Sequence, residues 1–414
     1  MKRTMDKKNL EIYIHIPFCV KKCDYCDFLS MKADESTKRE YVHALIREIE
    51  LSREKMKDYQ IDTVFIGGGT PSILDGEYIE EIMQALSENS LVSEDAEITI
   101  ECNPGTVTEE KLLTYRNAGI NRISFGLQSA DDEELKSIGR IHNYAQFEES
   151  FRLAREAGFD NINIDIMSAL PGQSIETYQN TLKKVISLQA EHISAYSLIV
   201  EEDTPLNDRV QEALEKGIDI LPDEDTEREM YYLTERKLSE ADYKRYEISN
   251  YSKAGYECRH NIGYWKRVEY LGFGLGAASM YQGMRYNNTY EMDKYIGLLS
   301  DGKDEDCDFY GDNDFFQDDI WDIREDVLSV LEGKIQRLTR KDMMEEFMFL
   351  GLRMIEGISE KEFQKNFGRS YDSVYGKVTE KLIAQELIEK NGDNVKLTKR
   401  GVDVSNYVMS QFLL

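Results

Sequence analysis

Six strand-like runs alternate with amphipathic helical segments through the first half of this 414-residue sequence. Each run is rich in Ile, Val, Phe and Tyr and is bounded by Gly, Pro or Asn, a pattern typical of β-strands. The strand-like runs cover residues 11–18, 61–67, 97–102, 122–127, 161–167 and 192–200, and the helical segments cover residues 37–50, 78–87, 109–118, 145–157 and 175–188. This alternation predicts an α/β fold whose parallel strands are joined by right-handed crossovers.

Two architectures fit this alternation, an open doubly wound sheet and a barrel or partial barrel. We favour a partial (β/α)6 barrel of the TIM type, because polar motifs follow the strands, where barrel active sites lie. The regular alternation ends after about residue 205, and residues 246–251 and 270–280 are rich in Tyr and Gly and read as irregular. We therefore expect a core domain over residues 1–240 and a second domain over residues 241–414.

The second domain holds two distinctive segments. Residues 301–326 contain twelve acidic and two basic residues, which predicts a solvated insertion spanning 301–335. From residue 341 onward the sequence predicts a mainly helical region similar to a winged helix. Its helices are expected over residues 343–354, 361–366 and 375–387, with a short strand pair near 394–397.

The charge balance restricts the partners of the chain. A net charge of −28 repels phosphate backbones and anionic headgroups, so we expect no nucleic acid partner and no binding to a membrane surface. No run of about 18 apolar residues is present to form a transmembrane segment. The first ten residues lack the apolar stretch of a secretory signal. These features predict a cytoplasmic protein.

Three of the six cysteines crowd into eight residues directly after the first strand-like run. Cys19, Cys23 and Cys26 have the spacing Cys-x3-Cys-x2-Cys, which indicates a metal site rather than a disulfide framework. Iron–sulfur clusters are held by cysteine thiolates, normally four of them. Three thiolates on one loop leave one iron of a [4Fe–4S] cluster open to a small molecule. A structural zinc site is the alternative, and it requires a fourth Cys or His.

Glycine-rich or polar motifs follow the next strands in turn. The second strand-like run leads into Gly67-Gly68-Gly69-Thr70-Pro71, whose glycines let a ligand approach the backbone closely. Glu101, Gln128 and Asp165 lie at or near the ends of the third, fourth and fifth runs, and Arg140 follows the fourth. Each has an ordinary alternative, such as a helix cap for Asp165 or a surface ion pair for Arg140. Their recurrence at successive strands favours one shared binding site.

With this cysteine spacing on the loop after the first strand, the chain resembles the radical S-adenosylmethionine superfamily. The resemblance implies a [4Fe–4S] cluster on Cys19, Cys23 and Cys26, with S-adenosylmethionine bound at the open iron. It also implies reductive cleavage of the sulfonium to a 5′-deoxyadenosyl radical, a reaction whose chemistry belongs to the cofactor.

A closer resemblance rests on longer phrases of sequence. Residues 13–19, 67–71, 121–129 and 192–204 are similar to those of oxygen-independent coproporphyrinogen oxidase and its relatives. This resemblance implies an S-adenosylmethionine site lined by Tyr13, Gly68, Gly69, Thr70, Glu101, Gln128, Arg140 and Asp165, with Tyr25 near it.

Two subfamilies differ after the cysteine triplet. The decarboxylating oxidases resemble one another in carrying a fourth cysteine, and Phe28 occupies that position here. Residues 258–265, Cys-Arg-His-Asn-Ile-Gly-Tyr-Trp, are similar to the His-Asn-x-x-Tyr-Trp motif of the HemW heme chaperone family. That resemblance implies a protein that binds heme and transfers it to an acceptor. The alternative is a radical enzyme acting on a tetrapyrrole, an oxygen-independent coproporphyrinogen III dehydrogenase, so enzymatic activity is left open.

The same motif supplies candidate heme residues. His260 is a possible axial ligand, and Tyr264 and Trp265 offer flat apolar faces to a macrocycle. The structural alternative is an aromatic corner packed against the barrel, with His260 hydrogen-bonded to backbone. One position departs from the family pattern, because Ala278 stands where relatives often carry a histidine.

Overall fold

The computed structural model describes residues 7–300 and 327–414, and the chain divides into two compact units. The first unit comprises residues 1–123, 146–159 and 269–336, and the second comprises residues 124–145, 160–268 and 337–414. The domain division at residue 240 stays a prediction. Residues 301–326 of the predicted acidic insertion lie outside the described residues.

Six strands, each followed by at least one helix, confirm the predicted alternation. The strands are β1 (Lys8–Ile16), β2 (Tyr59–Gly68), β3 (Val92–Cys102), β4 (Arg122–Gln128), β5 (Ile162–Ser168) and β6 (His192–Ser197). The helices that follow them are α1 (Glu35–Leu51), α2 (Arg53–Met56), η1 (Pro71–Ile73), α3 (Gly76–Asn89), α4 (Glu109–Asn117), α5 (Asp132–Ser137), α6 (Tyr144–Glu156), α7 (Ile175–Ser187), α8 (Pro205–Glu215) and α9 (Glu224–Glu240).

Strand β1 lies at the centre of the first unit. It pairs in parallel with β2 on one side and with β9 (Tyr270–Phe273) on the other, and β2 pairs in parallel with β3. Antiparallel pairing adds β10 (Ala278–Tyr281) and β11 (Met284–Asn287) beyond β9. Parallel pairing places the carboxyl ends of β1, β2 and β3 at one edge, so the loops that follow these strands meet there.

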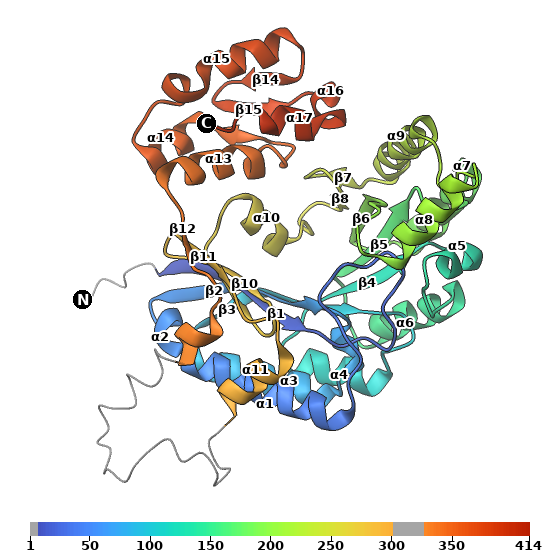
Figure 1. The fold of residues 1–414 in the computed structure, drawn as a ribbon, viewed down its shortest axis with the longest axis vertical. Coiled ribbons are helices and arrows are strands. Elements are labelled where there is room, and N and C mark those ends of the chain that lie inside the picture. Colours follow the sequence, from blue (N-terminus) through green and yellow to red (C-terminus); the bar gives the residue numbers. More distant parts are fainter. Residues whose placement is uncertain (1–6, 301–326) are drawn as a thin grey trace. The chain divides into compact units, whose positions relative to one another are not determined.

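Apolar spacing decides which faces are buried in this unit. Ile12, Ile14 and Ile16 alternate along β1 and are fully buried. Tyr41, Leu45 and other apolar residues of α1 recur at helical spacing and are also buried. Figure 1 shows α1, α3 and α4 side by side along the strands, in agreement with the packing of α1 on α3 and of α3 on α4.

Residues 270–280, which read as irregular, contain β9 and part of β10 instead. The prediction was wrong because these strands are short and pair over a long range: Glu11 of β1 faces Tyr270 of β9. Such pairing leaves little local signal in the sequence. A short helix, α11 (Met292–Leu299), follows and packs on α1.

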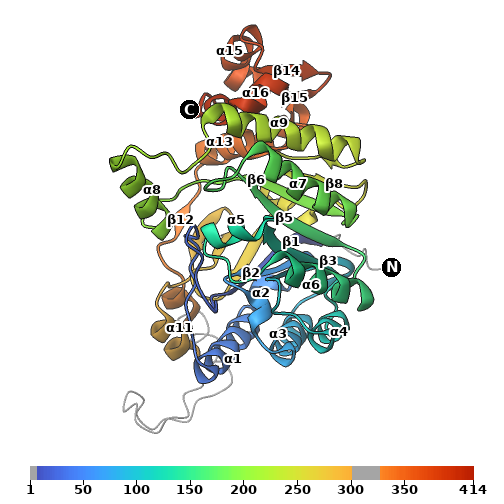
Figure 2. The same cartoon turned by 90° about the vertical axis from the view of Figure 1, so that its right-hand side faces the viewer.

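In the second unit, β5 pairs in parallel with β6. The antiparallel strand β8 (Asn250–Ser252) follows β6, and β7 (Lys244–Arg245) pairs with β8. Helices α7 and α9 pack against each other beside these strands (Figure 2). After β8, the chain forms the short helix α10 (Arg259–Trp265).

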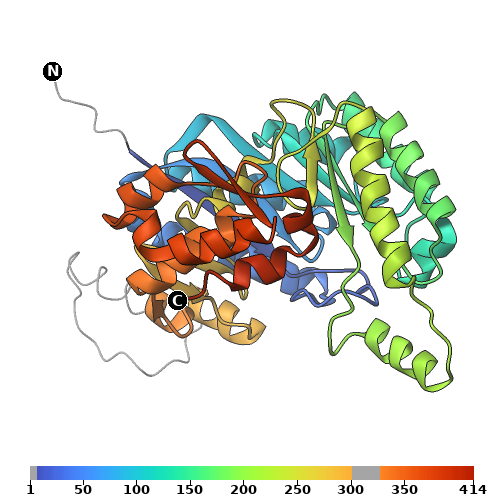
Figure 3. The same ribbon diagram turned by 90° about the horizontal axis from the view of Figure 1, so that it is seen from above.

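The C-terminal region of the second unit is mainly helical, as predicted. It contains α13 (Arg340–Gly351), α14 (Glu360–Phe367), α15 (Tyr371–Ala384), α16 (Lys399–Asp403) and α17 (Ser405–Ser410), with β13 (Ile358–Ser359), β14 (Ile388–Asn391) and β15 (Asn394–Leu397). The three strands form an antiparallel sheet ordered β13-β15-β14. Phe363, Tyr375 and Val395 are buried members of the apolar core of this region. Figure 3 shows its helices and strands from above, in orange and red.

Candidate functional site

The three clustered cysteines lie on one tethered loop after β1. Hydrogen bonds close the base of this loop, because the Cys19 N–H donates to the Met31 carbonyl (2.9 Å) and the Met31 N–H donates to the Pro17 carbonyl (2.7 Å). Inside the loop, the Cys26 N–H donates to the Cys23 carbonyl (3.2 Å). All three cysteines are half-buried. The sequence thus holds three thiols on a short, closed loop.

The thiols of this loop influence one another. Burial raises the pKa of the Cys26 thiol, and charge on Cys23 and Cys19 raises that pKa further. Across residues 7–300 and 327–414, no three His, Cys, Asp or Glu side chains converge around a single-ion position. A [4Fe–4S] cluster is larger than one ion and takes a separate thiolate at each protein-bound iron. Three half-buried thiols on one loop suit that donor chemistry.

The glycine loop after β2 packs directly on the start of the cysteine loop. The Gly69 N–H donates to the Ile16 carbonyl (2.9 Å), and a Cβ at Gly69 would lie 2.7 Å from the Phe18 carbonyl oxygen. Gly68 has a φ of +113°, a conformation that side chains disfavour, and its N–H donates to Oε2 of Glu101 (3.1 Å). Glycine is therefore required here by close backbone approach as well as by conformation.

Thr70 and Glu101 are brought to the same edge as the cysteines. The Thr70 Oγ1 lies 3.4 Å from the Cys19 Sγ and accepts a hydrogen bond from Asn103 Nδ2 (2.8 Å). Tyr13, from β1, is half-buried, and burial raises the pKa of its hydroxyl, with the charge of Glu101 adding to the increase. Tyr25 is half-buried on the cysteine loop itself.

His15, on β1, also belongs to this group, although the sequence pattern did not single it out. Its Nε2 lies 2.9 Å from the Leu29 carbonyl, so Nε2 carries the proton, and its Nδ1 then accepts from the Tyr13 hydroxyl (3.0 Å). Burial lowers the pKa of His15, which keeps the ring neutral. His15 thus links β1 to the cysteine loop through the Leu29 carbonyl. The sequence signal for this contact was the spacing of two residues between Tyr13 and His15, which places both side chains on one face of the strand.

The remaining predicted cofactor residues lie in the second unit. Gln128 ends β4 with a φ of 70°, and Arg140 donates from Nη2 to the Gly126 carbonyl of the same strand. The Asp165 carboxylate accepts from Asn163 Nδ2 (2.7 Å) and from Ser124 Oγ (3.3 Å). Asp165 is therefore held at β5 by its neighbours and does not cap a helix.

The predicted heme residues lie on α10. His260 is buried, and its ring packs edge-to-face against Tyr264 with centroids 4.7 Å apart. Trp265 is half-buried beneath the Arg353 guanidinium, which lies 4.3 Å from the ring centroid. His260 and Trp265 are five positions apart on the helix, so their side chains leave it in different directions. In this structure His260 is enclosed by protein.

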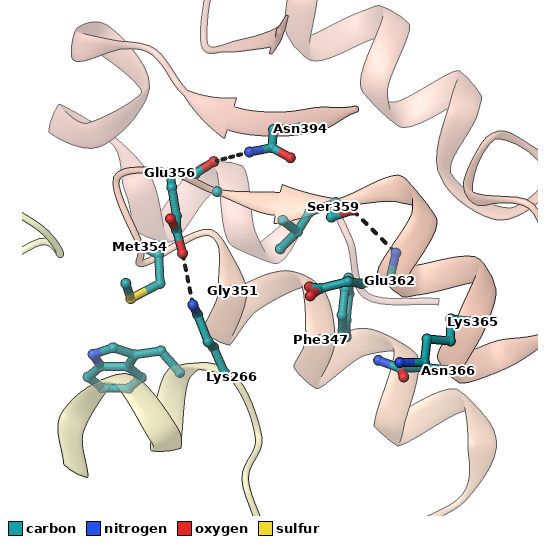
Figure 4. A pocket seen from close by; sticks show the side chains of 13 residues that line it. Lys266, Phe347, Gly351, Met354, Glu356, Ser359, Glu362, Lys365, Asn366 and Asn394 are labelled. Carbon is teal, nitrogen blue, oxygen red and sulfur yellow. Dashed lines mark hydrogen bonds and ion pairs between the residues drawn. The ribbon is translucent and has the colours of Figure 1, made fainter. Parts of the chain in front are cut away.

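A cavity of about 370 Å³ opens beside the end of α10 (Figure 4). Trp265 and Lys266 contribute one wall, and Phe347, Met354 and Ile358 contribute apolar surface. Its other lining residues are Gly351, Glu356, Gly357, Ser359, Glu362, Lys365, Asn366 and Asn394. Lys266 and Glu356 form an ion pair across 3.0 Å at its edge. Trp265 is thus the predicted heme residue that faces open space.

The chain is similar to known proteins, both in its domains and over its full length. Residues 13–185 match the model of the radical SAM superfamily, and residues 338–404 match the HemN C-terminal domain. The chain is therefore a radical SAM protein, which confirms the predicted [4Fe–4S] cluster and S-adenosylmethionine as its cofactors. The heme chaperone HemW of Bacillus subtilis is 36% identical and covers 97% of this chain and 98% of its own length. HemW of Lactococcus lactis is 34% identical over 99% of both chains. The chain belongs to the HemW family.

A solved structure shows the fold independently. Coproporphyrinogen III oxidase (HemN) from Escherichia coli, a radical SAM enzyme, superimposes with a TM-score of 0.80 over 98% of this chain and 90% of its own. The identity is 21%, so this likeness confirms the predicted fold class alone. In the described part of the chain, no helix combines the length and apolar character that crossing a bilayer requires.

Proposed function

We propose that this protein is a heme chaperone, which binds heme and passes it to an acceptor protein while carrying a [4Fe–4S] cluster and S-adenosylmethionine. The observation that carries the proposal is full-length similarity to proteins named heme chaperone HemW, at 31–36% identity in three bacteria. The motif at 258–265 supports it, since its residues 259–265 form one helix, α10, beside an open cavity. We also propose that the chain works in the cytoplasm and without nucleic acid.

Cys19, Cys23 and Cys26 would hold the cluster, which supplies an electron to the bound sulfonium. Gly68, Gly69, Thr70, Tyr13, Tyr25, Glu101, Gln128, Arg140 and Asp165 would hold S-adenosylmethionine. The chemistry of these side chains suits that ligand: carboxylates accept from ribose hydroxyls and an amino group, and a guanidinium pairs with a carboxylate.

His260, Tyr264 and Trp265 would handle heme. The enclosure of His260 by Tyr264 means that its imidazole reaches an iron only after α10 shifts, whereas Trp265 already faces the cavity. Heme capture at α10 is therefore a conformational event in this proposal. A protein that must also release heme benefits from such a closed state, because the free energy gained when α10 closes again favours the release of heme.

Oxidative decarboxylation of coproporphyrinogen III is the second candidate, favoured by the fold shared with HemN. Phe28 occupies the position at which the oxidases carry their fourth cysteine, and this residue is 64% exposed. Anaerobic incubation of cluster-loaded protein with S-adenosylmethionine, a reductant and coproporphyrinogen III separates the candidates. We expect no vinyl-bearing product, and its formation would replace the chaperone proposal with the oxidase.

A heme titration followed by absorbance tests the binding step directly. We expect saturable binding by wild type and at least about ten-fold weaker binding by His260→Gln, the loss of one ligand bond. His43→Gln, at an exposed position on α1, is the matched control and retains wild-type affinity. Unchanged binding by His260→Gln removes His260 as a ligand, and no binding by wild type refutes the proposed function.

A further inference from the structure

A continuous chain of hydrogen bonds runs from Asp165 to the start of α10 within the second unit. Asn163 Nδ2 contacts the Asp165 carboxylate (2.7 Å), and Asn163 Oδ1 contacts His192 Nδ1 (2.6 Å). His192 Nε2 contacts the Tyr246 hydroxyl (2.7 Å), and the Tyr246 hydroxyl contacts the Cys258 N–H (3.2 Å). Cys258 immediately precedes α10, so these four contacts connect a predicted cofactor residue to the predicted heme helix.

In this series of hydrogen bonds, every donor lies on the side of Cys258 and every acceptor on the side of Asp165. The Asp165 carboxylate can only accept, so the Asn163 amide nitrogen donates to it and the Asn163 carbonyl oxygen accepts from His192 Nδ1–H. The Nε2 of a neutral His192 ring then accepts from the Tyr246 hydroxyl, whose oxygen accepts from the Cys258 N–H. One tautomer of His192 and one orientation of the Asn163 amide satisfy every contact. Turning the Asn163 amide round would place its carbonyl oxygen against the Asp165 carboxylate, two acceptors face to face.

Burial makes these links strong and interdependent. His192, Asn163 and Cys258 are at most 2% exposed, and the Tyr246 ring packs edge-to-face on His192 with centroids 5.6 Å apart. Hydrogen bonds shielded from water polarise one another, and breaking one leaves a buried polar group without compensation. A change at Asp165 or at Cys258 therefore affects the other hydrogen bonds in this series more than it would at the protein surface.

Tyr246 also joins α10 to the C-terminal region. Its carbonyl accepts from the Ile355 N–H (3.0 Å), and the adjacent Glu247 forms a β-bridge with Met354. Met354 lines the cavity beside Trp265. The segment that carries Tyr246 thus holds both the beginning of α10 and one wall of the cavity at its end.

We propose that His192 and Tyr246 are positioning residues that couple ligand binding at Asp165 to heme binding at α10. The inference rests on the proposed function and extends it to a mechanism of regulation. A ligand hydroxyl that donates to Oδ1 of Asp165, the oxygen that accepts from Asn163, displaces the Asn163 amide from that oxygen. Rotation of that amide removes the acceptor of His192, and the Tyr246 hydroxyl and the Cys258 N–H lose their alignment in turn. Release of the Cys258 N–H frees α10 to expose His260.

The expected result is that S-adenosylmethionine tightens heme binding by at least about five-fold, the lower end of ordinary coupling between two sites. The measurement is heme affinity of cluster-loaded protein with and without S-adenosylmethionine, in the absence of reductant so that the cofactor is not consumed. By reciprocity, heme tightens the binding of S-adenosylmethionine by the same factor.

Tyr246→Phe removes the hydroxyl and keeps the ring. We expect this variant to bind each ligand alone, with the effect of S-adenosylmethionine on heme affinity reduced to about two-fold or less. Tyr243→Phe is the matched control, since the buried Tyr243 hydroxyl donates to the Ala190 carbonyl outside the chain of contacts. It retains wild-type coupling. Equal coupling in wild type and Tyr246→Phe overturns the proposal.

A second measurement does not depend on how well a variant folds. In wild-type protein, the ¹⁵N chemical shift of His192 Nε2 reports whether this nitrogen accepts from Tyr246. We expect S-adenosylmethionine to change this shift, and an unchanged shift overturns the coupling. If wild type binds no heme, the proposed function fails. If it binds heme without any effect of S-adenosylmethionine, only the present inference fails.

Discussion

The Sγ of Cys19 lies 3.4 Å from the Oγ1 of Thr70, although 51 residues separate the two in the chain. The contact exists because β1 and β2 pair in parallel, with His15 facing Gly67 and Ile16 facing Gly68. The loops that follow both strands therefore start at the same edge. The predicted cluster thiols and a glycine-rich backbone meet there, an arrangement that suits the proposed cluster with a small-molecule ligand.

Replacing one cluster cysteine should abolish the iron site. Anaerobically purified wild type is expected to contain about four iron and four sulfide per chain. Cys23→Ala should lose nearly all of both, because two thiolates on a half-exposed loop do not retain a cubane. Cys102→Ala is the control, since Cys102 is buried at the end of β3. Iron and sulfide analysis checks the prediction, and a full complement in Cys23→Ala would contradict it.

Gly69→Ala should damage the site through backbone overlap. The added Cβ would lie 2.7 Å from the Phe18 carbonyl oxygen, one residue before Cys19. Overpacking of this kind costs about 1–3 kcal/mol in the free energy of unfolding, and the displaced loop should also take up less iron. Gly297→Ala, in α11 with open space around it, should be neutral or stabilising by up to about 1 kcal/mol. Urea denaturation and iron content measure both effects. Equal behaviour of the two variants would rule out the overlap.

Glu48 should make the protein less stable as pH rises. Burial raises the pKa of this carboxyl from 4.5 to about 7, although hydrogen bonds from Tyr295, Gly274 and Asn288 partly offset the rise. Unfolding therefore releases a proton between pH 4.5 and 7, and the free energy of unfolding falls through that window. The loss is of the order of 3 kcal/mol.

Urea denaturation of wild type and Glu48→Gln from pH 4.5 to 8 checks this dependence. We expect the difference between the two proteins to vary with pH, and Glu40→Gln, exposed on the same helix, to follow wild type. Parallel curves for wild type and Glu48→Gln would show that Glu48 titrates normally.

His142 should make the protein less stable as pH falls. Burial, with the charge of Arg140, lowers the pKa of His142 from 6.5 to about 3, and its neutral ring donates from Nε2 to the Leu127 carbonyl (3.3 Å). Unfolding takes up a proton between pH 6.5 and 3, so stability is lost as pH falls through that window. From pH 6.5 to 4.5 the loss is about 3 kcal/mol.

His142→Gln should lose less stability than wild type over the same pH range, and His43→Gln, at an exposed site, should match wild type. Denaturation at the two pH values measures this difference. The prediction fails if wild type and His142→Gln lose stability equally.

The cofactors could be predicted because the chemistry of the candidate site is local in sequence. The spacing of Cys19, Cys23 and Cys26 indicates thiolate ligands on one loop, and the residues 67–71 indicate a backbone open to close approach. Alternating apolar residues fix which face of β1 is buried. These signals can be read without knowledge of any distant contact. The fold class followed from the alternation of strand-like and helical segments, and the family followed from longer phrases such as residues 258–265.

The tertiary structure decided which residues act together. His15 holds the cysteine loop through Tyr13 and Leu29, and His192 reaches Tyr246 across 54 residues of chain. The resting state of His260, enclosed against Tyr264, is likewise invisible in its motif. Residue types and spacings specify what chemistry a side chain offers, whereas partners, protonation and exposure depend on packing between segments far apart in the chain. For that reason the sequence alone determined the cofactors of this protein, and only its three-dimensional packing determined the partners, protonation and burial of the candidate site residues.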